Sequence, residues 1–399
     1  MARLLQKSSR MPEWSAIDTN LGTSPMMPPD PTFNWREFML ETIDVIEHVA
    51  MDVDMTGGRA LATVRRISAL DPIPNADRIE LATVDGWQVV VAKDVGHKVG
   101  DLIIYFEIDS FLPIEPQYEF LRKGCHTKNT VYGEGFRLKT IRLRGALSQG
   151  LIMPMSDMYS SLLGSNDFYE GQDVTEILGV KKYEKPLPAS LGGIARGNFP
   201  SFIPKTDEDR IQNCFGRLKN KVPDQLYEAT VKLDGTSFTA YYHRETDRFG
   251  VCSRNLDLEE TEGNLYWQIA RQFNIEDILG AEDGSFAIQG EIIGAGVNGN
   301  WEGINHNELY IFNVWDIDNR RYLDSDERHD FAMRNGLKNA PVIGYHRFSE
   351  FDSVNDFLQF ADGPSIYNDQ REGVVFKGVD DPSISFKVIS NAWLISSGE

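Results

Sequence analysis

A lysine, an aspartate and a glycine stand close together in the run Lys232-Leu-Asp234-Gly235. The neutral amine of a lysine is a nucleophile, and burial near other cations or a metal lowers the pKa of the ammonium group enough to expose it. Residues two apart on a strand share a face, so Asp234 would lie beside this amine and could hold hydrated Mg²⁺. Gly235 would permit a tight turn close to a bound ligand. A single tetrapeptide of this kind establishes no function alone.

Three further pieces follow that tetrapeptide in a fixed order. They are Gly290-Glu291 at the end of an apolar segment, an aromatic segment around Phe312, and Glu372-Gly-Val-Val-Phe-Lys377. The ordered set is far more specific than any one piece. It resembles the signature of the covalent lysyl-AMP nucleotidyltransferases, the superfamily of ATP-dependent DNA ligases, RNA ligases and mRNA capping enzymes.

This resemblance implies a nucleotide reaction at Lys232. In the superfamily the lysine attacks the α-phosphorus of ATP, releases pyrophosphate and carries AMP as a phosphoramide. Glu291 is then expected to contact the ribose or the metal-bound waters. Glu372 is expected to be a second acidic metal ligand through water, together with Asp234. The implied cofactors are ATP and Mg²⁺ or Mn²⁺.

Further residues are implied as nucleotide contacts. Ser253-Arg254-Asn255 resembles the element whose arginine contacts phosphate or ribose, and a planar, permanently charged guanidinium suits that task. Phe312 aligns with the aromatic residue that stacks on adenine, although a core phenylalanine in an apolar strand would look the same. Lys377 is an expected phosphate contact. Lys387 is expected to neutralise charge on the α-phosphate and the leaving group.

The last element departs from the family pattern. It usually reads Lys-x-Lys, whereas this chain has Ser385-Phe-Lys387. The first lysine is missing, so the resemblance implies no role for residue 385. The membership of the superfamily does not depend on that position.

A glycine-rich run after Glu291 matches a different pattern. Residues Gly294-Ala-Gly296-Val-Asn-Gly299 fit the G-x-G-x-x-G of dinucleotide-binding sites. Such a site needs a helix that opens at the glycines and an acidic residue about 20 positions later. The chain continues with Asn300 and Trp301 and shows no helical period, so we reject a dinucleotide-binding fold.

The composition is that of an ordinary globular protein. The chain has 399 residues, 41% hydrophobic and 25% charged, and is long enough for two domains. No apolar run approaches the roughly 18 residues of a membrane span, so no membrane association is expected. The three cysteines and seven histidines are scattered without metal-ligand spacing. This argues against a disulfide framework and a zinc site, and favours a reducing cytoplasm.

The formal net charge of −20 is unusual for a protein that binds nucleic acid. The distribution of charge matters more than its sum, however. Residues 122–144 contain seven lysines and arginines against one glutamate. A solvated strand face would show the same excess, but the motifs downstream point to a polynucleotide. We therefore interpret part of this segment as RNA-binding, through Arg137, Lys139, Arg142 and Arg144.

The pattern along the chain predicts five segments. Residues 1–33 are rich in Pro, Met and Ser and predict a disordered extension, and residues 34–55 have the apolar spacing of an amphipathic helix. Short apolar or alternating runs between turns at 56–155 predict a small closed β-barrel. Residues 156–200 are interpreted as a linker. Residues 201–399 show strands, with helices near 265–273 and 324–335, which indicates an α+β domain with mostly antiparallel sheets.

Local resemblances refine this organisation. Residues 74–81 resemble the start of the tRNA-binding OB-fold module of some aminoacyl-tRNA synthetases, so the barrel is expected to be an OB fold. An OB fold that precedes the nucleotidyltransferase domain is typical of the RNA ligases that repair nicked RNA. Residues 142–151, 204–213 and 385–391 resemble the same family, and Arg210 in the second stretch is a candidate contact to the nucleotide phosphates. DNA ligases and capping enzymes resemble each other in carrying an OB domain after the last motif, where only 12 residues remain here.

The prediction is therefore an ATP-dependent RNA ligase that joins 3′-OH and 5′-phosphate ends through lysyl-AMP and a 5′-adenylated RNA. Nicked duplex RNA is the expected substrate, and a cytoplasmic monomer is the expected form. One alternative is an RNA- or tRNA-binding protein with an inactive ligase-like domain, which loss of Lys232, Glu291 or Glu372 would favour. Another is a different polynucleotide ligase or a capping-type nucleotidyltransferase, which dependence on GTP would favour.

Overall fold

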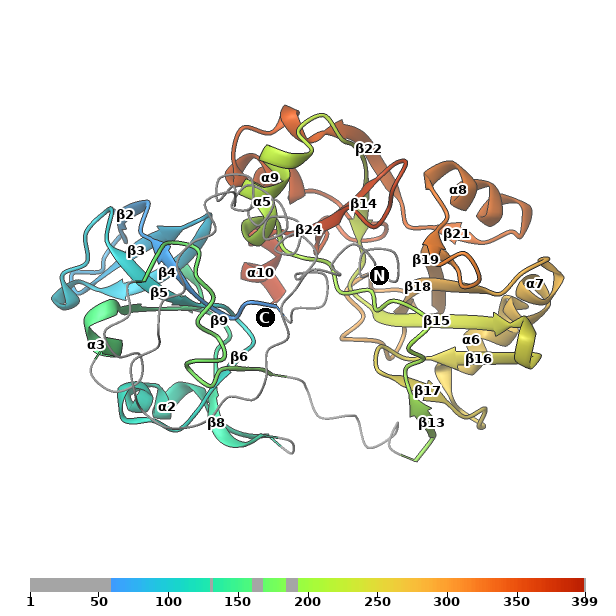
Figure 1. Cartoon of the computed structure of the whole chain (residues 1–399), viewed down its shortest axis with the longest axis horizontal. Helices are drawn as coiled ribbons and strands as arrows, with labels where there is room; N and C mark the ends of the chain where they lie inside the picture. The colour runs from blue at the N-terminus through green and yellow to red at the C-terminus, as the bar shows by residue number, and fades with distance from the viewer. Residues whose placement is uncertain (1–58, 130–131, 160–167, 184–192, 398–399) are drawn as a thin grey trace, which may run out of the picture. The chain divides into compact units, whose positions relative to one another are not determined.

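The structure, a computed structural model, describes residues 59–399 apart from 130–131, 160–167, 184–192 and 398–399 (Figure 1). The extension predicted at 1–33 and the helix predicted at 34–55 lie outside the described residues. Residues 59–399 belong to one structural unit, which contains an N-terminal barrel and a larger C-terminal domain.

The N-terminal barrel is built around strand β5 (Leu102–Phe106), a continuous apolar run. Ile103 and Tyr105 pack into one buried apolar cluster, and Ile104 and Phe106 pack into another. This division follows from the alternation of side chains along a strand. Because both faces of β5 are buried, the strand joins the two halves of the barrel core.

The described strands of this barrel form four small antiparallel sheets. In sheet order these are β1 (Ala62–Arg66), β5 and β11 (Leu151–Pro154); β2 (Ala69–Pro72), β3 (Ile79–Val84) and β4 (Trp87–Ala92); β10 (Ala146–Gln149) and β9 (Thr140–Leu143); and β12 (Lys181–Lys182), β6 (Ser110–Leu112), β8 (Gly133–Arg137) and β7 (His126–Asn129). The short helices are η2 (Lys93–Val95), η3 (Pro116–Leu121), α2 (Arg122–Cys125) and α3 (Met155–Tyr159).

The barrel extends further along the chain than the sequence predicted. Val174, Leu178 and Val180 are buried in the apolar cluster of β1 and β5, and β12 adds a strand at the edge of β6. A large part of the linker predicted at 156–200 therefore belongs to the barrel. These apolar residues lie in and beside a single turn, outside any strand or helix, so periodicity could not assign them to a core.

The C-terminal domain contains two sheets whose pairings are antiparallel except for that of β19 with β21. The larger sheet is, in order, β13 (Ala195–Asn198), β17 (Leu256–Leu258), β16 (Arg248–Cys252), β15 (Thr236–His243), β18 (Phe286–Gly294), β19 (Asn307–Asp316) and β20 (Arg321–Tyr322), with β21 (Lys338–Asn339) beside β19. The smaller sheet is β22 (Val342–Arg347), β14 (Leu226–Lys232), β23 (Gly373–Gly378) and β24 (Ser385–Ile389). The helical elements are α5 (Ile211–Lys221), η4 (Arg244–Thr246), α6 (Leu265–Gln272), α7 (Ile275–Ala281), α8 (Ser325–Arg334), η5 (Phe348–Glu350), α9 (Val354–Ala361) and α10 (Asn391–Ser397).

The predicted α+β class with mostly antiparallel sheets is confirmed, and the helices predicted near 265–273 and 324–335 are α6 and α8. Helix α8 begins at a capping box, in which Asp324 accepts from the backbone of Glu327 and Glu327 accepts from the backbone of Asp324. This reciprocal pair satisfies two amide groups that would otherwise lack partners at the start of the helix.

Each of the two sheets has one apolar face and one polar face, and this arrangement determines where the candidate site lies. Helices α6, α7 and α8 cover one face of the larger sheet, and α5 and α9 cover one face of the smaller sheet. The uncovered faces carry polar side chains such as Gln289, Glu291 and Asn313 on one sheet and Lys377 on the other. Lys377 Nζ donates to Asn313 Oδ1 at 2.7 Å. The polar faces of the two sheets therefore meet.

Candidate active site

Strand β14 presents Lys232 to the polar cleft. Glu228, Thr230 and Lys232 share one face of the strand, while Tyr227 and Ala229 point into the apolar core on the other face. Lys232 pairs with Gly373 of β23, so Glu372 immediately precedes the paired residue. The Nζ atom of Lys232 lies 2.5 Å from Oε2 of Glu372.

Three carboxylates surround this amine. Burial alone would lower the pKa of Lys232, but Glu372, Glu291 and Asp234 together raise it above its ordinary value. The expectation that neighbouring cations lower the pKa of Lys232 is therefore wrong, because its charged neighbours in this structure are carboxylates that raise the pKa. Burial raises the pKa of Glu291 to about 8, against the opposing charge of Lys232 and with support from Glu372 and Asp234. The site is an anionic pocket around a charged lysine.

Asp234 is held by the glycine-rich run that resembled a dinucleotide motif. Asn298 Nδ2 donates to Asp234 Oδ1, from a loop in which Asn298 has φ 38°. Gly235 is needed for close packing, because a Cβ atom there would lie 2.2 Å from the carbonyl oxygen of Ile292. Gly235 thus allows the backbone that follows Lys232 to pack closely against β18, the strand that carries Glu291.

Phe312 and Lys377 lie together at the other end of the cleft. Lys377 pairs with Glu228 of β14. Glu228 precedes Lys232 by four residues on that strand, so the two ends of the site are about 13 Å apart along it. The Nζ atom of Lys377 lies 5.3 Å from the centroid of the Phe312 ring. Lys377 therefore lies beside Phe312, the residue expected to stack on adenine. It lies far from Lys232, near which the α-phosphate of ATP is expected.

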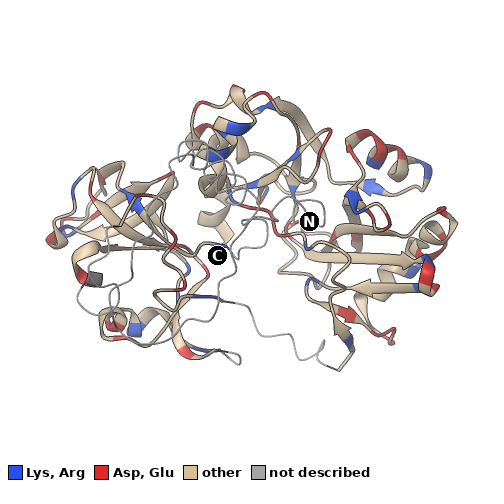
Figure 2. Ribbon diagram, viewed as in Figure 1, with Lys and Arg blue, Asp and Glu red and all other residues tan. Residues whose placement is uncertain are grey.

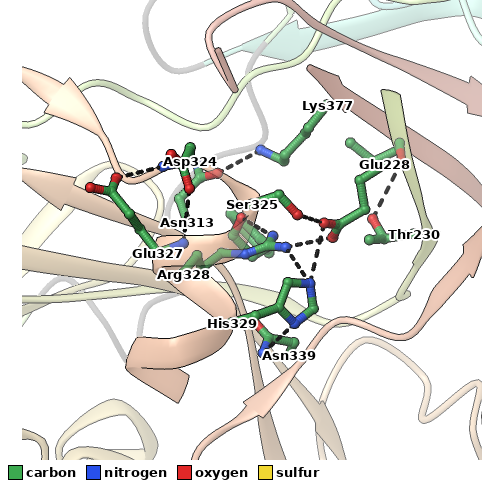
Figure 3. Close-up of polar contacts among 12 residues, drawn as sticks. Glu228, Thr230, Asn313, Asp324, Ser325, Glu327, Arg328, His329, Asn339 and Lys377 are labelled. Atoms are coloured by element: carbon green, nitrogen blue, oxygen red, sulfur yellow. Dashed lines mark hydrogen bonds and ion pairs between the residues drawn. The ribbon is translucent and has the colours of Figure 1, made fainter. Parts of the chain in front are cut away.

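A buried polar network ties the nucleophile strand to α8 at this end of the cleft (Figure 3). Glu228 is 2% exposed and accepts from Arg328, which is 4% exposed, from Ser325 and from His329. Arg328 also donates to the carbonyl oxygen of Phe312 at 3.1 Å. One arginine thus links the strand of Lys232 to the strand of Phe312.

Three consecutive acidic residues in the segment 204–213 pair with basic residues from several parts of the protein. Asp207 pairs with Arg254 and with Lys182 of β12. Glu208 pairs with Lys377 at 3.1 Å and accepts from Ser385, and Asp209 pairs with Arg217 at 3.3 Å. Arg254 and Lys377, both expected to contact the nucleotide, therefore already have anionic partners within the protein.

Lys387 and Arg210 lie side by side. The backbone N–H of Lys387 donates to the carbonyl oxygen of Asp209 at 2.7 Å, and Arg210 forms a parallel β-bridge with Lys387. Burial and the charges of Arg210 and Lys232 lower the pKa of Lys387 to about 7. These three cations are close enough to repel one another, so an anion such as a phosphate would stabilise them.

The four basic residues predicted to bind RNA differ in their exposure and in the partners they have within the protein. Arg137 pairs with Asp109 at 3.0 Å and stacks on Tyr183, so it is committed to the barrel itself. Arg142 is exposed in the β9–β10 hairpin and donates to the carbonyl oxygen of Ile395 in α10. Arg144 is exposed in the turn of that hairpin with φ 52°, and Lys139 is exposed just before it. Figure 2 shows basic and acidic residues interspersed over the described protein.

The described residues contain no cluster of three His, Cys, Asp or Glu side chains that could bind a metal ion directly. The chemistry of Asp234, Glu291 and Glu372 nevertheless suits a hydrated divalent cation, because hard cations prefer oxygen ligands and retain water. The same three carboxylates raise the pKa of Lys232, so a cation among them would offset charge where the amine must lose its proton. These residues therefore fit a metal held through water.

In the described part of the chain, no helix is long and apolar enough to span a membrane.

Several residues of the site escaped the sequence analysis. Glu208, Asn298, Asn313 and Arg328 are polar residues without a motif of their own, and only their contacts reveal them. Glu208 lies in the stretch 204–213, whose family resemblance pointed only to Arg210. The Trp87 side chain of the barrel, which contacts Arg210, gave no signal because it reads as an ordinary strand residue.

Comparisons with known proteins agree with this geometry. A family model for an OB-fold domain matches residues 61–155, and a family model for RNA ligase matches residues 225–389. A comparison with curated proteins finds no match.

Solved structures of one relative match nearly the whole described chain. A variant of Naegleria gruberi RNA ligase with AMP and manganese is 40% identical, with a TM-score of 0.75, and the match covers 85% of this chain and 99% of that one. Another variant of that ligase, with ATP and manganese, is also 40% identical, with a TM-score of 0.74 and coverage of 84% and 98%. The same ligase with pyrophosphate has 40% identity, a TM-score of 0.74 and coverage of 86% and 99%. The predicted order of an OB fold followed by a ligase domain is confirmed, and this chain belongs to the RNA ligase family.

Proposed function

We propose that this RNA ligase uses ATP to seal 3′-OH and 5′-phosphate ends, with nicked duplex RNA as its substrate, and that Lys232 is the nucleophile. One observation carries the proposal: Lys232 ends a strand in a polar cleft and is surrounded by Glu372, Glu291 and Asp234. The relative of known structure, which is 40% identical, has been solved with ATP, with AMP and with pyrophosphate, and these are the reactant and the two released products of the proposed sealing reaction.

Three phosphoryl transfers account for the reaction. The Lys232 amine loses a proton and bonds to the α-phosphorus of ATP while the bond to pyrophosphate breaks. A 5′-phosphate oxygen of RNA then bonds to that phosphorus, and the bond to Lys232 breaks as the amine regains a proton. Finally a 3′-OH attacks the RNA 5′-phosphate, loses its proton and expels AMP.

The residues of the cleft divide this work. Lys387 and Arg210 are placed to stabilise charge near Lys232, because both are cationic and both adjoin its pocket. Phe312 offers an aromatic surface at the far end of the cleft, and Arg328 fixes its backbone. Arg254 is exposed and would exchange its ion pair with Asp207 for a contact with a phosphate or ribose. Lys377 would act at the same end of the cleft as Phe312, where its ammonium group lies over the aromatic ring.

Asp234, Glu291 and Glu372 would hold a hydrated Mg²⁺ or Mn²⁺. When bound, such a cation offsets the charge of the phosphates and carboxylates and thereby favours the neutral form of the nearby amine. Glu372 has a second task, because its ion pair with Lys232 holds the lysine side chain in place.

The RNA contacts are proposed for the exposed hairpin of β9 and β10. Arg144 and Lys139 are exposed and available to phosphates, and phosphate contacts fix the position of a duplex without reading its sequence. Arg142 would contribute while also contacting α10, and Arg137 would support the barrel more than the RNA.

A sealing assay tests this function. A nicked RNA duplex with a labelled 5′-phosphate is incubated with the enzyme, ATP and Mg²⁺, alongside the same duplex with a 5′-OH. The proposal predicts a joined strand and a transient 5′-adenylated strand from the first duplex and neither from the second. Joining of nicked DNA alone would identify a different polynucleotide ligase, and RNA binding without any adenylate would identify an inactive ligase-like domain.

Two further properties stay predictions. A monomer is proposed, and light scattering at several protein concentrations tests it. A cytoplasmic location is proposed because Cys125, Cys214 and Cys252 are all free thiols, as in proteins of reducing compartments. Fractionation of the source cells tests the location.

A further inference from the structure

The barrel reaches into the nucleotide site through one tryptophan. Trp87, the first residue of β4, is 1% exposed and belongs to an apolar cluster of the barrel. Its indole Nε1 donates to Asn213 Oδ1 at 3.3 Å, and the guanidinium of Arg210 lies 5.4 Å from the centroid of its ring. Arg210 and Asn213 frame the first turn of α5 in the other domain. A barrel side chain therefore contacts that turn on two sides.

Arg210 has an unused donor at this contact. Its Nη1 atom is buried and has no hydrogen-bond partner among the described residues. The nearby carboxylate of Glu107 is 2% exposed and attracts the charge of Arg210, but the hydrogen bonds that it accepts come from Arg59, with Nε–O at 2.6 Å, and from Asn213. A buried donor without a partner is costly, and a charged donor most of all, which makes Arg210 ready to bind an anion.

The backbone connects Arg210 to the residues around the nucleophile. Arg210 forms a β-bridge with Lys387, and Lys387 lies opposite Val375, which in turn lies opposite Thr230 on the strand of Lys232. The charges of Arg210 and Lys232 both act on Lys387. The guanidinium of Arg210 thus contacts the barrel on one side and lies near Lys387, whose charge also responds to Lys232.

We propose that Trp87 is a positioning residue for nucleotide transfer. Its ring face holds the Arg210 guanidinium toward the phosphates of ATP, and its N–H bond to Asn213 fixes the ring. A tryptophan suits this task because its electron-rich face attracts a guanidinium and its side chain is rigid. The barrel would then act in the first reaction step, before RNA is bound. This inference rests on the proposed function, in which Lys232 takes AMP from ATP.

The test uses the full chain and measures AMP transfer to the protein without RNA, over a series of ATP concentrations. Trp87→Leu and Trp87→Phe are each made with Arg210 and with Arg210→Ala. We expect Trp87→Leu to reduce the apparent second-order rate with ATP by about 5- to 20-fold, and Trp87→Phe by about 3-fold or less, from the usual strength of a cation–π contact. In the Arg210→Ala background Trp87→Leu should have no further effect, because the two residues act as a unit.

Controls separate positioning from folding. Phe120→Leu replaces an aromatic residue of the same barrel that is 63% exposed and should leave AMP transfer unchanged. Asn213→Ala removes the partner of the indole from outside the barrel core, and we expect a reduction of about 2- to 5-fold that also vanishes with Arg210→Ala. If circular dichroism shows that Trp87→Leu does not fold, Asn213→Ala becomes the decisive variant.

Either of two results would overturn the inference. Trp87→Leu could transfer AMP at the wild-type rate, or it could reduce transfer by the same factor with and without Arg210. The second result would mean that Trp87 acts only through the stability of the barrel. Absence of AMP transfer in the wild-type protein would instead contradict the proposed function itself.

Discussion

Lys232 and Glu372 form an ion pair in which the ammonium nitrogen lies 2.5 Å from a carboxylate oxygen. With Glu291 and Asp234 nearby, this pair raises the pKa of Lys232 although burial would lower it. These carboxylates therefore favour the protonated, non-nucleophilic form of Lys232. Positive charge near Glu372 and Asp234 would offset this effect and favour loss of the proton.

This relationship predicts a strict need for a divalent cation in the first step. A chelator such as EDTA should reduce AMP transfer to Lys232 by at least about 100-fold, which corresponds to roughly 2.7 kcal/mol of barrier. The measurement is labelled AMP bound to protein after a fixed time, with Mg²⁺ in excess of EDTA as the control. Transfer at an undiminished rate in EDTA would mean that the protein alone can deprotonate the lysine.

The pKa of Lys387, about 7, predicts a pH dependence of nucleotide binding. Because the pKa is lowered, the side chain loses its positive charge as the pH rises through 7, and its attraction for phosphate is lost with it. The affinity for an ATP analogue with an α,β-methylene bridge should fall several-fold between about pH 6 and pH 8.5, since charge-assisted contacts are about twice as strong as neutral ones. Calorimetry measures this affinity without the reaction.

The matched variant for this prediction is Lys387→Arg, whose charge does not titrate in this range. Its affinity should depend on pH less steeply, and the remaining dependence is attributed to Glu291, whose pKa is about 8. An equally steep decline in this variant would show that Lys387 is not the titrating group.

The β9–β10 hairpin predicts a separation between AMP transfer and RNA sealing. Arg144→Ala together with Arg142→Ala should leave AMP transfer intact and weaken binding of nicked RNA, with the salt dependence of binding reduced by about one charge per lost phosphate contact. Of the single changes, Arg144→Ala should act only on RNA, whereas Arg142→Ala also removes the contact with Ile395. Unchanged sealing in the double variant would remove the hairpin from the RNA-binding surface.

The network in Figure 3 predicts a large effect on stability. Arg328→Met leaves the 2%-exposed carboxylate of Glu228 without its main partner, and removal of one member of a buried ion pair costs about 3–5 kcal/mol. Urea unfolding measures the change in the free energy of unfolding. The double variant Glu228→Gln with Arg328→Met should recover part of the loss, because no buried charge is left unpaired. A loss below about 1 kcal/mol for Arg328→Met would contradict this account of the network.

Motifs predicted the chemistry of this chain better than they predicted its contacts. Lys232, Glu291 and Glu372 are far apart in sequence, yet the structure brings them together, because β14 and β23 are neighbours in the smaller sheet and β18 belongs to the larger sheet, whose polar face meets theirs. The barrel could be predicted from short apolar runs and a local resemblance. Its extension to Val180 could not, since turns leave no periodic trace.

Residues that act through a neighbour are invisible to spacing. Trp87 reads as a core residue and Glu208 as one of three acids in a surface run, until their partners Arg210 and Lys377 are known. Likewise, the positive charge of Arg137 predicted RNA binding, but its ion pair with Asp109 could not be predicted from the sequence. Charge in a sequence reports what a residue can bind, and only the fold decides which partner it meets.

The most direct test of the central claim is the transfer of label from α-³²P-ATP to the protein with Mg²⁺, read on a denaturing gel. Wild-type protein, freed beforehand of bound AMP with pyrophosphate, is compared with Lys232→Ala. The account predicts a labelled band in the wild type, removed by added pyrophosphate, and no band in the variant. A band of equal strength in Lys232→Ala, or no band in the wild type, would contradict the assignment of Lys232 as the nucleophile of an ATP-dependent RNA ligase.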